Sequence, residues 1–128
     1  MKNKIESTII ITAENQERFI ERCIKSCLNQ SVKHIEIIII FTKLKNINTL
    51  KRRYLSKNIV FLNIPKKINK PTQDQLFKIK QGLLISKGKY IFLLDGDDAY
   101  KKNKVKEAIN SIRDKRALFL DNYENNKN

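Results

Sequence analysis

The most chemically suggestive feature of this sequence is a cluster of three carboxylates, Asp95-Gly96-Asp97-Asp98. They are three of only thirteen acids in a chain with 27 Lys and Arg. In an extended segment Asp95 and Asp97 point to the same side, so two hard oxygen ligands converge as Mg²⁺ or Mn²⁺ requires, with positions left for phosphate oxygens. Asp-Gly is also a favoured turn dipeptide, and a plain turn is the alternative interpretation.

Strand and helix patterns alternate along the whole chain. Short, nearly continuous apolar runs predict buried strands, and apolar residues at helical spacing predict the helices between them. The predicted strands are Ser7–Thr12, Ile35–Phe41, Ile59–Ile64, Tyr90–Leu94 and Ala117–Leu120. The predicted helices are Phe19–Leu28, Thr49–Ser56, Thr72–Leu84 and Asn103–Arg113.

Local signals mark the ends of these helices. Asn15 is a candidate N-cap of the first helix. Thr72-Gln73-Asp74-Gln75 has the form of a capping box at the start of the third helix, and Gly88 suits the left-handed position after its end. The predicted apolar positions of that helix are Leu76, Phe77, Ile79, Leu83 and Leu84.

This order of elements predicts one α/β domain over residues 1–128, with 121–128 as a frayed tail. We expect a Rossmann-like, three-layer arrangement with a mostly parallel sheet of four to five strands and helices on both faces. Ligands of such sheets bind beyond the carboxyl ends of the strands. The residues expected there are 12–15, Thr42, Lys43 and 95–98. Because the acidic cluster falls at this edge, its position favours a metal site over a plain turn.

The charge balance supplies a second hypothesis. The formal net charge is +14, and the segment from Ile37 to Gln73 holds nine Lys and Arg but no Asp or Glu. A basic binding module for nucleic acid or an anionic membrane surface is therefore the alternative function. No nucleic-acid motif is present, however. The counts of 21 Lys, 14 Asn and 20 Ile match a coding bias, and a surface selected to bind phosphates would more often carry Arg, of which there are 6.

Cysteine usage and hydropathy bear on location. Cys23 and Cys27 lie four residues apart on the first predicted helix, which predicts two buried thiols rather than a redox pair. The chain shows neither a signal-peptide core nor an apolar run of membrane-spanning length. We expect a cytoplasmic protein, with peripheral attachment to the inner face of the membrane as the alternative.

Four collinear blocks resemble family 2 glycosyltransferases of the GT-A fold. They are residues 7–15, 18–30 and 35–40, and Gly82 with 88–98. The likeness implies the N-terminal, nucleotide-sugar-binding half of such an enzyme, and so a hexosyltransferase-like, inverting transfer from a nucleotide-diphosphate sugar, UDP-sugar by family likeness, to an acceptor hydroxyl. It also implies Mg²⁺ or Mn²⁺ held by Asp97, with Asp95 facing the ribose or the metal's hydration shell. Thr12 and Glu14 would lie beside the base.

The sequence departs from the family pattern at several positions. Family members usually have a tyrosine where Glu14 stands, and aspartates follow their second strand where this chain has Thr42 and Lys43. Their acceptor-binding half and catalytic base lie beyond the metal motif, so the catalytic base stays unknown. We therefore expect a chain truncated relative to family members, with an open sheet edge that a partner chain covers, or else a degenerate fragment.

Overall fold

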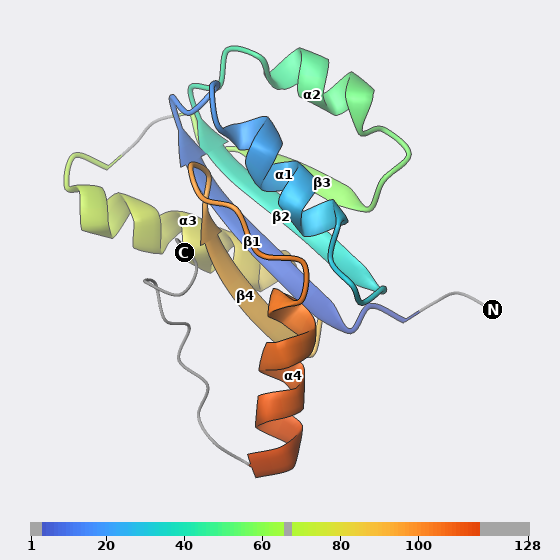
Figure 1. Cartoon of the computed structure of the whole chain (residues 1–128). Coiled ribbons are helices and arrows are strands. Elements are labelled where there is room, and N and C mark those ends of the chain that lie inside the picture. The colour runs from blue at the N-terminus through green and yellow to red at the C-terminus, as the bar shows by residue number, and fades with distance from the viewer. Residues whose placement is uncertain (1–3, 66–67, 116–128) are drawn as a thin grey trace.

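The computed structural model describes residues 4–65 and 68–115, which form four strands and four helices in strict alternation (Figure 1). The strands are β1 (Ser7–Glu14), β2 (Ile35–Thr42), β3 (Ile59–Asn63) and β4 (Tyr90–Asp95). The helices are α1 (Ile20–Leu28), α2 (Ile47–Arg53), α3 (Pro71–Ile85) and α4 (Lys104–Lys115). The strand predicted at 117–120 and the tail 121–128 lie outside the described residues.

All four strands are parallel, in the order β3-β2-β1-β4. Ile10 of β1 lies opposite Ile38 of β2 on one side and Leu93 of β4 on the other. The chain moves outward from β1 to β3 and then crosses to the far side of β1, so the direction of winding reverses beside β1. Right-handed connections then require α3 to lie on the opposite face from α1 and α2. The predicted parallel sheet with helices on both faces is confirmed.

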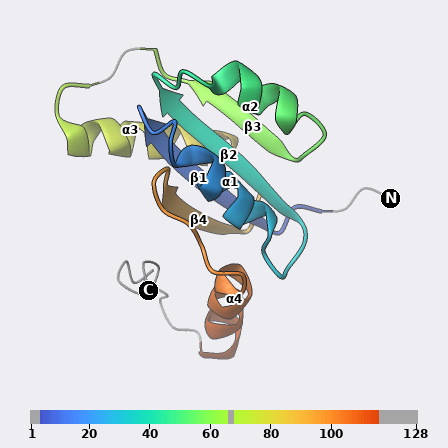
Figure 2. The same ribbon diagram turned by 45° about the horizontal axis from the view of Figure 1, so that its top comes forward.

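The two faces of the sheet have cores of very different size. Residues of α1, α2 and α4 pack with the strands in one large cluster that includes Ile9, Ile39 and Leu50. The other face has a small cluster of Ile10, Ile38 and Ile40, beside α3. Figure 2 shows α1 in front of the sheet, α3 behind it and α4 beside β4. Most of the stability from apolar burial therefore resides on the α1 face.

Helix α3 packs against the sheet with the side opposite to the one predicted. Asp74, Lys78 and Gly82, spaced four residues apart, are its buried residues. A Cβ on Gly82 would lie 2.8 Å from Cγ2 of Ile10, so the helix approaches β1 more closely than a larger residue allows. Four of the predicted apolar positions are exposed instead, and the fifth is half-buried: Leu76, Phe77, Leu83 and Leu84, with Ile79.

The predicted helix caps are also wrong. Asn15 precedes α1 by several residues in a left-handed conformation (φ 53°), and Phe19 is the N-cap. Helix α3 begins with Pro71 in its first turn and Lys70 as its N-cap, without a side-chain capping bond. Proline suits this position because its missing N–H costs no helical hydrogen bond there.

The two thiols of α1 are buried and free, as predicted. The neighbouring Cys27 thiol, together with burial, raises the pKa of Cys23 above its ordinary value. Both groups therefore act as small apolar core residues. Among the described helices, none combines the length and the apolar character that crossing a membrane requires.

Gly88 has a packing role instead of the predicted left-handed one, since no glycine in the described residues has a positive φ. A Cβ at this position would lie 2.6 Å from the backbone of Ser7 and Thr8, and the Gly88 N–H donates to Oγ1 of Thr8 at 2.9 Å. The Thr8 hydroxyl in turn donates to the buried carboxylate of Glu36 at 2.6 Å. Gly88 is thus needed for the close approach of the α3–β4 loop to β1.

Replacing Gly88 by alanine is therefore expected to lower the free energy of unfolding by about 1–3 kcal/mol, because the added methyl meets backbone that cannot move aside. Urea unfolding followed by circular dichroism measures the effect. Lys87→Ala, at the exposed neighbouring position, is the control and should change stability by less than about 0.5 kcal/mol. Equal stabilities for the two variants would contradict this account of Gly88.

Candidate functional site

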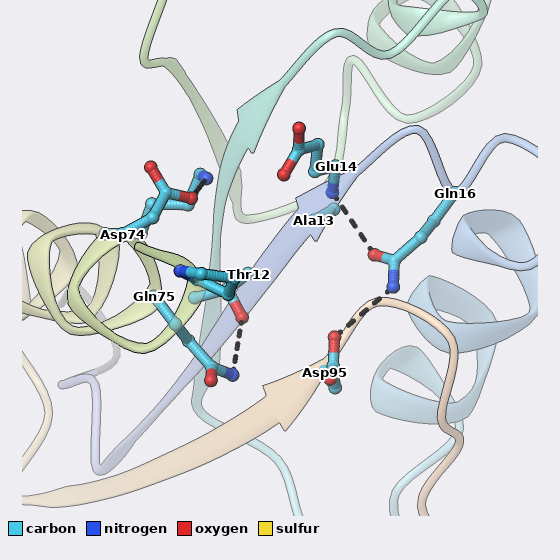
Figure 3. Close-up of a pocket in the computed structure, with 9 residues that line it drawn as sticks. Thr12, Ala13, Glu14, Gln16, Asp74, Gln75 and Asp95 are labelled. Carbon is cyan, nitrogen blue, oxygen red and sulfur yellow. Dashed lines mark hydrogen bonds and ion pairs between the residues drawn. The ribbon is translucent and has the colours of Figure 1, made fainter. Parts of the chain in front are cut away.

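The carboxyl ends of β1 and β4 meet where the winding of the sheet reverses. Ligands of open α/β sheets bind at such switch points. A pocket of about 230 Å³ opens there (Figure 3). Its lining residues come from the end of β1, the loop after it, the first half of α3 and the last residue of β4: Thr12, Ala13, Glu14, Gln16, Pro71, Asp74, Gln75, Lys78 and Asp95.

Two glutamines connect the parts of this pocket. The Gln16 amide donates to Oδ1 of Asp95 at 3.4 Å, and its oxygen accepts from the backbone N–H of Glu14 at 3.3 Å (Figure 3). On the other side, the Gln75 amide donates to the Thr12 hydroxyl at 3.5 Å. These contacts are long, so a ligand with better-placed donors and acceptors can replace them at small cost.

A buried ion pair forms one wall. Asp74 and Lys78 lie one helical turn apart on the inner side of α3 and are paired, with side chains only 7% and 3% exposed. The other Asp74 oxygen accepts from the backbone N–H of Ile68 at 2.9 Å, which fixes the start of α3. The lysine charge is matched within the wall, and two further carboxylates, Glu14 and Asp95, line the pocket.

The environment of Asp95 disfavours the ionised form of its side chain. Burial, followed by the charge of Asp97, raises its pKa, and the hydrogen bond from Gln16 only partly opposes this. Burial removes water from the ionised carboxylate, and the neighbouring negative charge repels it. A bound cation would supply compensating positive charge.

The acidic cluster is not extended after Asp95, contrary to the sequence-based geometry. Gly96 and Asp97 form a turn closed by a hydrogen bond from the Asp98 N–H to the Asp95 carbonyl at 2.9 Å. The plain-turn interpretation is thus right about the backbone. The Asp97 side chain is exposed, and the residue lies outside the pocket lining, while its carbonyl accepts from Arg22 of α1 at 3.0 Å.

The turn is held against β1 at Gly96. Its N–H donates to the Thr12 carbonyl at 2.9 Å, and a Cβ here would lie 2.9 Å from the methyl of Ala13. A Cβ would also lie 2.5 Å from Oε1 of Gln16 and 3.2 Å from the Thr12 carbonyl oxygen, so a larger residue would require both Gln16 and β1 to shift. The position of the acidic cluster beside the pocket is therefore set by the backbone of β1.

The loop after β2 contributes less than the sequence suggested. Thr42 is buried and its hydroxyl donates to the Ile64 carbonyl at 2.8 Å, and neither Thr42 nor Lys43 lines the pocket. Lys43 has a left-handed backbone (φ 57°), and its carbonyl accepts from the Asn15 N–H at 3.1 Å. This loop supports the β1 loop rather than facing a ligand.

The structure thus brings together three of the four predicted site residues. Thr12, Glu14 and Asp95 line one pocket, and Asp97 lies on the adjoining turn. Sequence reasoning missed Gln16 and the α3 residues Asp74, Gln75 and Lys78. A signal for the latter was available, because a helix that follows a parallel strand begins at the carboxyl edge of the sheet. The capping-box interpretation had assigned Asp74 and Gln75 to a local role.

Sequence comparison finds no match for the chain among protein-family models or curated proteins. Solved structures do match. S. aureus TarS 1–349 in complex with UDP has a TM-score of 0.71 at 18% identity, over 87% of this chain and 33% of that chain. The mannosyltransferase PcManGT from Pyrobaculum calidifontis, in complex with GDP-Man and Mn²⁺, has a TM-score of 0.72 at 13% identity, over 88% and 34% of the two chains.

The chain shares the fold of the matching parts of TarS and PcManGT. A further TarS 1–349 structure, in complex with UDP-GlcNAc, gives a TM-score of 0.69 at 19% identity over 87% of this chain. The resemblance seen in the sequence is thereby confirmed at the level of the fold, and the Rossmann-like α/β class with it. This chain spans about a third of the length of these TarS 1–349 and PcManGT chains.

The raised pKa of Asp95 predicts that replacing this residue by a neutral one stabilises the folded protein. A raised pKa means that the folded state binds the proton more tightly than the unfolded state, so ionisation costs stability as pH rises past the unfolded pKa of about 3.9. Asp95→Asn should therefore unfold at higher urea concentration than wild type at pH 7. The difference should disappear below about pH 3.9.

Asp74→Asn is the matched control at the same pocket. It leaves the buried Lys78 charge unpaired and should destabilise the fold by about 3–5 kcal/mol at pH 7. A loss of stability in both variants would show that the ionised Asp95 side chain stabilises the fold, contrary to this prediction.

Proposed function

We propose that this chain is the donor-binding part of a glycosyltransferase and binds a nucleotide-diphosphate sugar at the pocket between β1, β4 and α3. The observation that carries the proposal is the convergence of Thr12, Glu14 and Asp95 in one pocket at the switch point of the sheet. The fold supports it, because TarS and PcManGT structures contain UDP, UDP-GlcNAc or GDP-Man.

The chemistry of the pocket suits the nucleoside. Ribose hydroxyls and the N–H groups of a base are hydrogen-bond donors, and Glu14 and Asp95 offer carboxylate acceptors. Thr12 and the two glutamine amides can donate or accept, and their present contacts are long. A carboxylate from the β2 loop, which the family likeness leads one to expect, is replaced here by Thr42 and Lys43. Glu14 and Asp95 are accordingly the residues that select the nucleoside.

We infer that a divalent metal would be held at the turn together with the substrate. The described residues contain no group of three or more His, Cys, Asp or Glu that could hold a metal ion without further ligands. Mg²⁺ and Mn²⁺ sites of phosphate-binding enzymes commonly use one or two carboxylates together with substrate phosphates and water. Asp97, with Asp95, would supply the carboxylates. Burial, followed by the charge of Asp97, raises the pKa of Asp95, and a bound cation would favour its ionised form. The metal would neutralise charge on the diphosphate leaving group.

The chain's own residues then bind and orient the donor. Thr12 and Glu14 hold the nucleoside end, and Asp95 lies between it and the turn that carries Asp97. The sugar would extend from this edge toward the acceptor, whose hydroxyl attacks the anomeric carbon in line with the departing diphosphate and inverts its configuration. Positioning of the donor is the contribution that the pocket makes to the rate.

Isothermal titration calorimetry tests the proposal. The full chain is titrated with UDP, UDP-GlcNAc and GDP-mannose, each with and without Mn²⁺. We expect binding of at least one nucleotide only when Mn²⁺ is present, because the charges of Asp95 and Asp97 repel a diphosphate that carries no metal. Asp97→Asn should raise Kd by about 10–100-fold, as loss of a metal contact does.

Glu107→Gln is the control for the removal of one negative charge. Glu107 is exposed on α4 and does not line the pocket, so its replacement should leave Kd unchanged. If no nucleotide binds under any condition, or if both variants weaken binding equally, the proposed site is wrong.

A further inference from the structure

Many apolar side chains are exposed to solvent on the side of the molecule where α3 covers the sheet. Twelve large apolar side chains are exposed among the described residues, and nine of these lie in α3, in the loop leading to it, or at strand positions that point to its face. On the outer side of α3, Leu76 and Leu84 are 59% and 70% exposed. Contiguous exposed apolar surface of this kind marks an interaction site.

The patch continues from α3 onto β4. Ile91 and Leu93 are exposed and alternate along the strand with Phe92 and Leu94, which belong to the large core on the other face. Leu93 also lines a groove of about 300 Å³ together with Ile79 of α3, and the groove reaches Thr12, Gln75 and Asp95 of the candidate site. Helix and strand therefore present one apolar surface, which we call the α3 face.

The exposed charged residues of α3 and of the loop after it are of one sign. Lys80 lies one turn from both Leu76 and Leu84, within the apolar stripe, and Lys87 follows the helix; both are exposed. Between Ile37 and Leu94 the only acid is Asp74, which is buried and paired with Lys78. The α3 face thus combines apolar side chains with lysines and has no exposed carboxylate from this segment.

We propose that the α3 face is a docking surface for an anionic lipid bilayer, with α3 lying in the plane of the interface. This goes beyond the proposed donor binding and does not depend on it. A helix with exposed leucines and interspersed lysines buries its apolar side chains at the acyl boundary and pairs its charges with anionic headgroups.

The position of Lys80 favours a bilayer over a protein partner. In the middle of a dry protein interface its ammonium would need a matched, desolvated carboxylate. At a bilayer surface the flexible side chain can extend to the headgroups while its methylene stem stays with the leucines. Nucleic acid is a poorer fit, because Phe77 is the single aromatic residue of α3, leucine and isoleucine provide no stacking surface, and the helix carries no arginine.

Vesicle co-sedimentation of the full chain tests the proposal. Vesicles of phosphatidylcholine alone are compared with vesicles that also contain phosphatidylglycerol, at low and high salt. We expect the protein to sediment with the anionic vesicles only, and less of it as salt rises. The double variant Leu76→Gln/Leu84→Gln should bind at least about tenfold more weakly, because it loses two inserting side chains. Lys80→Gln should weaken binding to a smaller extent.

Matched controls lie on the α1 face of the molecule. Leu55 is 83% exposed and Lys57 is exposed, both in the turn between α2 and β3. Leu55→Gln and Lys57→Gln should bind vesicles as wild type does. Circular dichroism melts of all variants establish that they are folded, which exposed substitutions should allow.

Three results would overturn the proposal. The first is the absence of wild-type binding to anionic vesicles, and the second is equal loss of binding in the α3 variants and in their controls. The third is self-association of the wild type in sedimentation velocity that Leu76→Gln/Leu84→Gln abolishes, because the α3 face would then be covered by a second copy of this chain. Binding to a mixed-sequence RNA without binding to anionic vesicles would also overturn the proposal.

Discussion

The hydrogen-bonded position of β1 between two parallel strands is the constraint on which the rest of the structure depends. Ile9, Ile10 and Ile11 are fully buried because β2 and β4 flank the strand and helices cover both faces. Since β2 and β4 lie on opposite sides of β1, the winding of the chain must reverse there, and a pocket opens beside the paired carboxyl ends of β1 and β4. The same strand fixes the acidic turn, through the contact of Gly96 with the Thr12 carbonyl.

Packing on the two faces explains which parts of the fold could be predicted from sequence. The continuous apolar runs Ile9–Ile11 and Ile37–Ile40 predict strands that are buried on both faces, as observed. The apolar residues of α1 recur at helical spacing on the side that is buried. For these elements local pattern and tertiary burial agree, so the parallel sheet, its first helix and the edge that carries the site follow from sequence.

Helix α3 shows where such prediction fails. Its apolar residues predicted the buried side, but close approach to β1 needs Gly82, and the paired Asp74 and Lys78 take the neighbouring buried positions. A buried ion pair and a glycine contact depend on geometry that no periodicity encodes. The same limit applies to the pocket: Thr12, Glu14 and Asp95 were identified by their place at strand ends, whereas the α3 residues were hidden by an apparent capping motif.

The central claim is that the pocket at the β1–β4 switch point binds a nucleotide-sugar with a divalent metal at the adjoining turn. Two-dimensional ¹H–¹⁵N NMR of the full chain tests it most directly, with UDP-GlcNAc and GDP-mannose added in turn in the presence of Mg²⁺ and then trace Mn²⁺. The account predicts shift changes confined to the end of β1, the start of α3 and Asp95–Asp98, and paramagnetic broadening centred on Asp97 and its neighbours. Shift changes centred on the α2 segment instead, or no change with either donor, would contradict it.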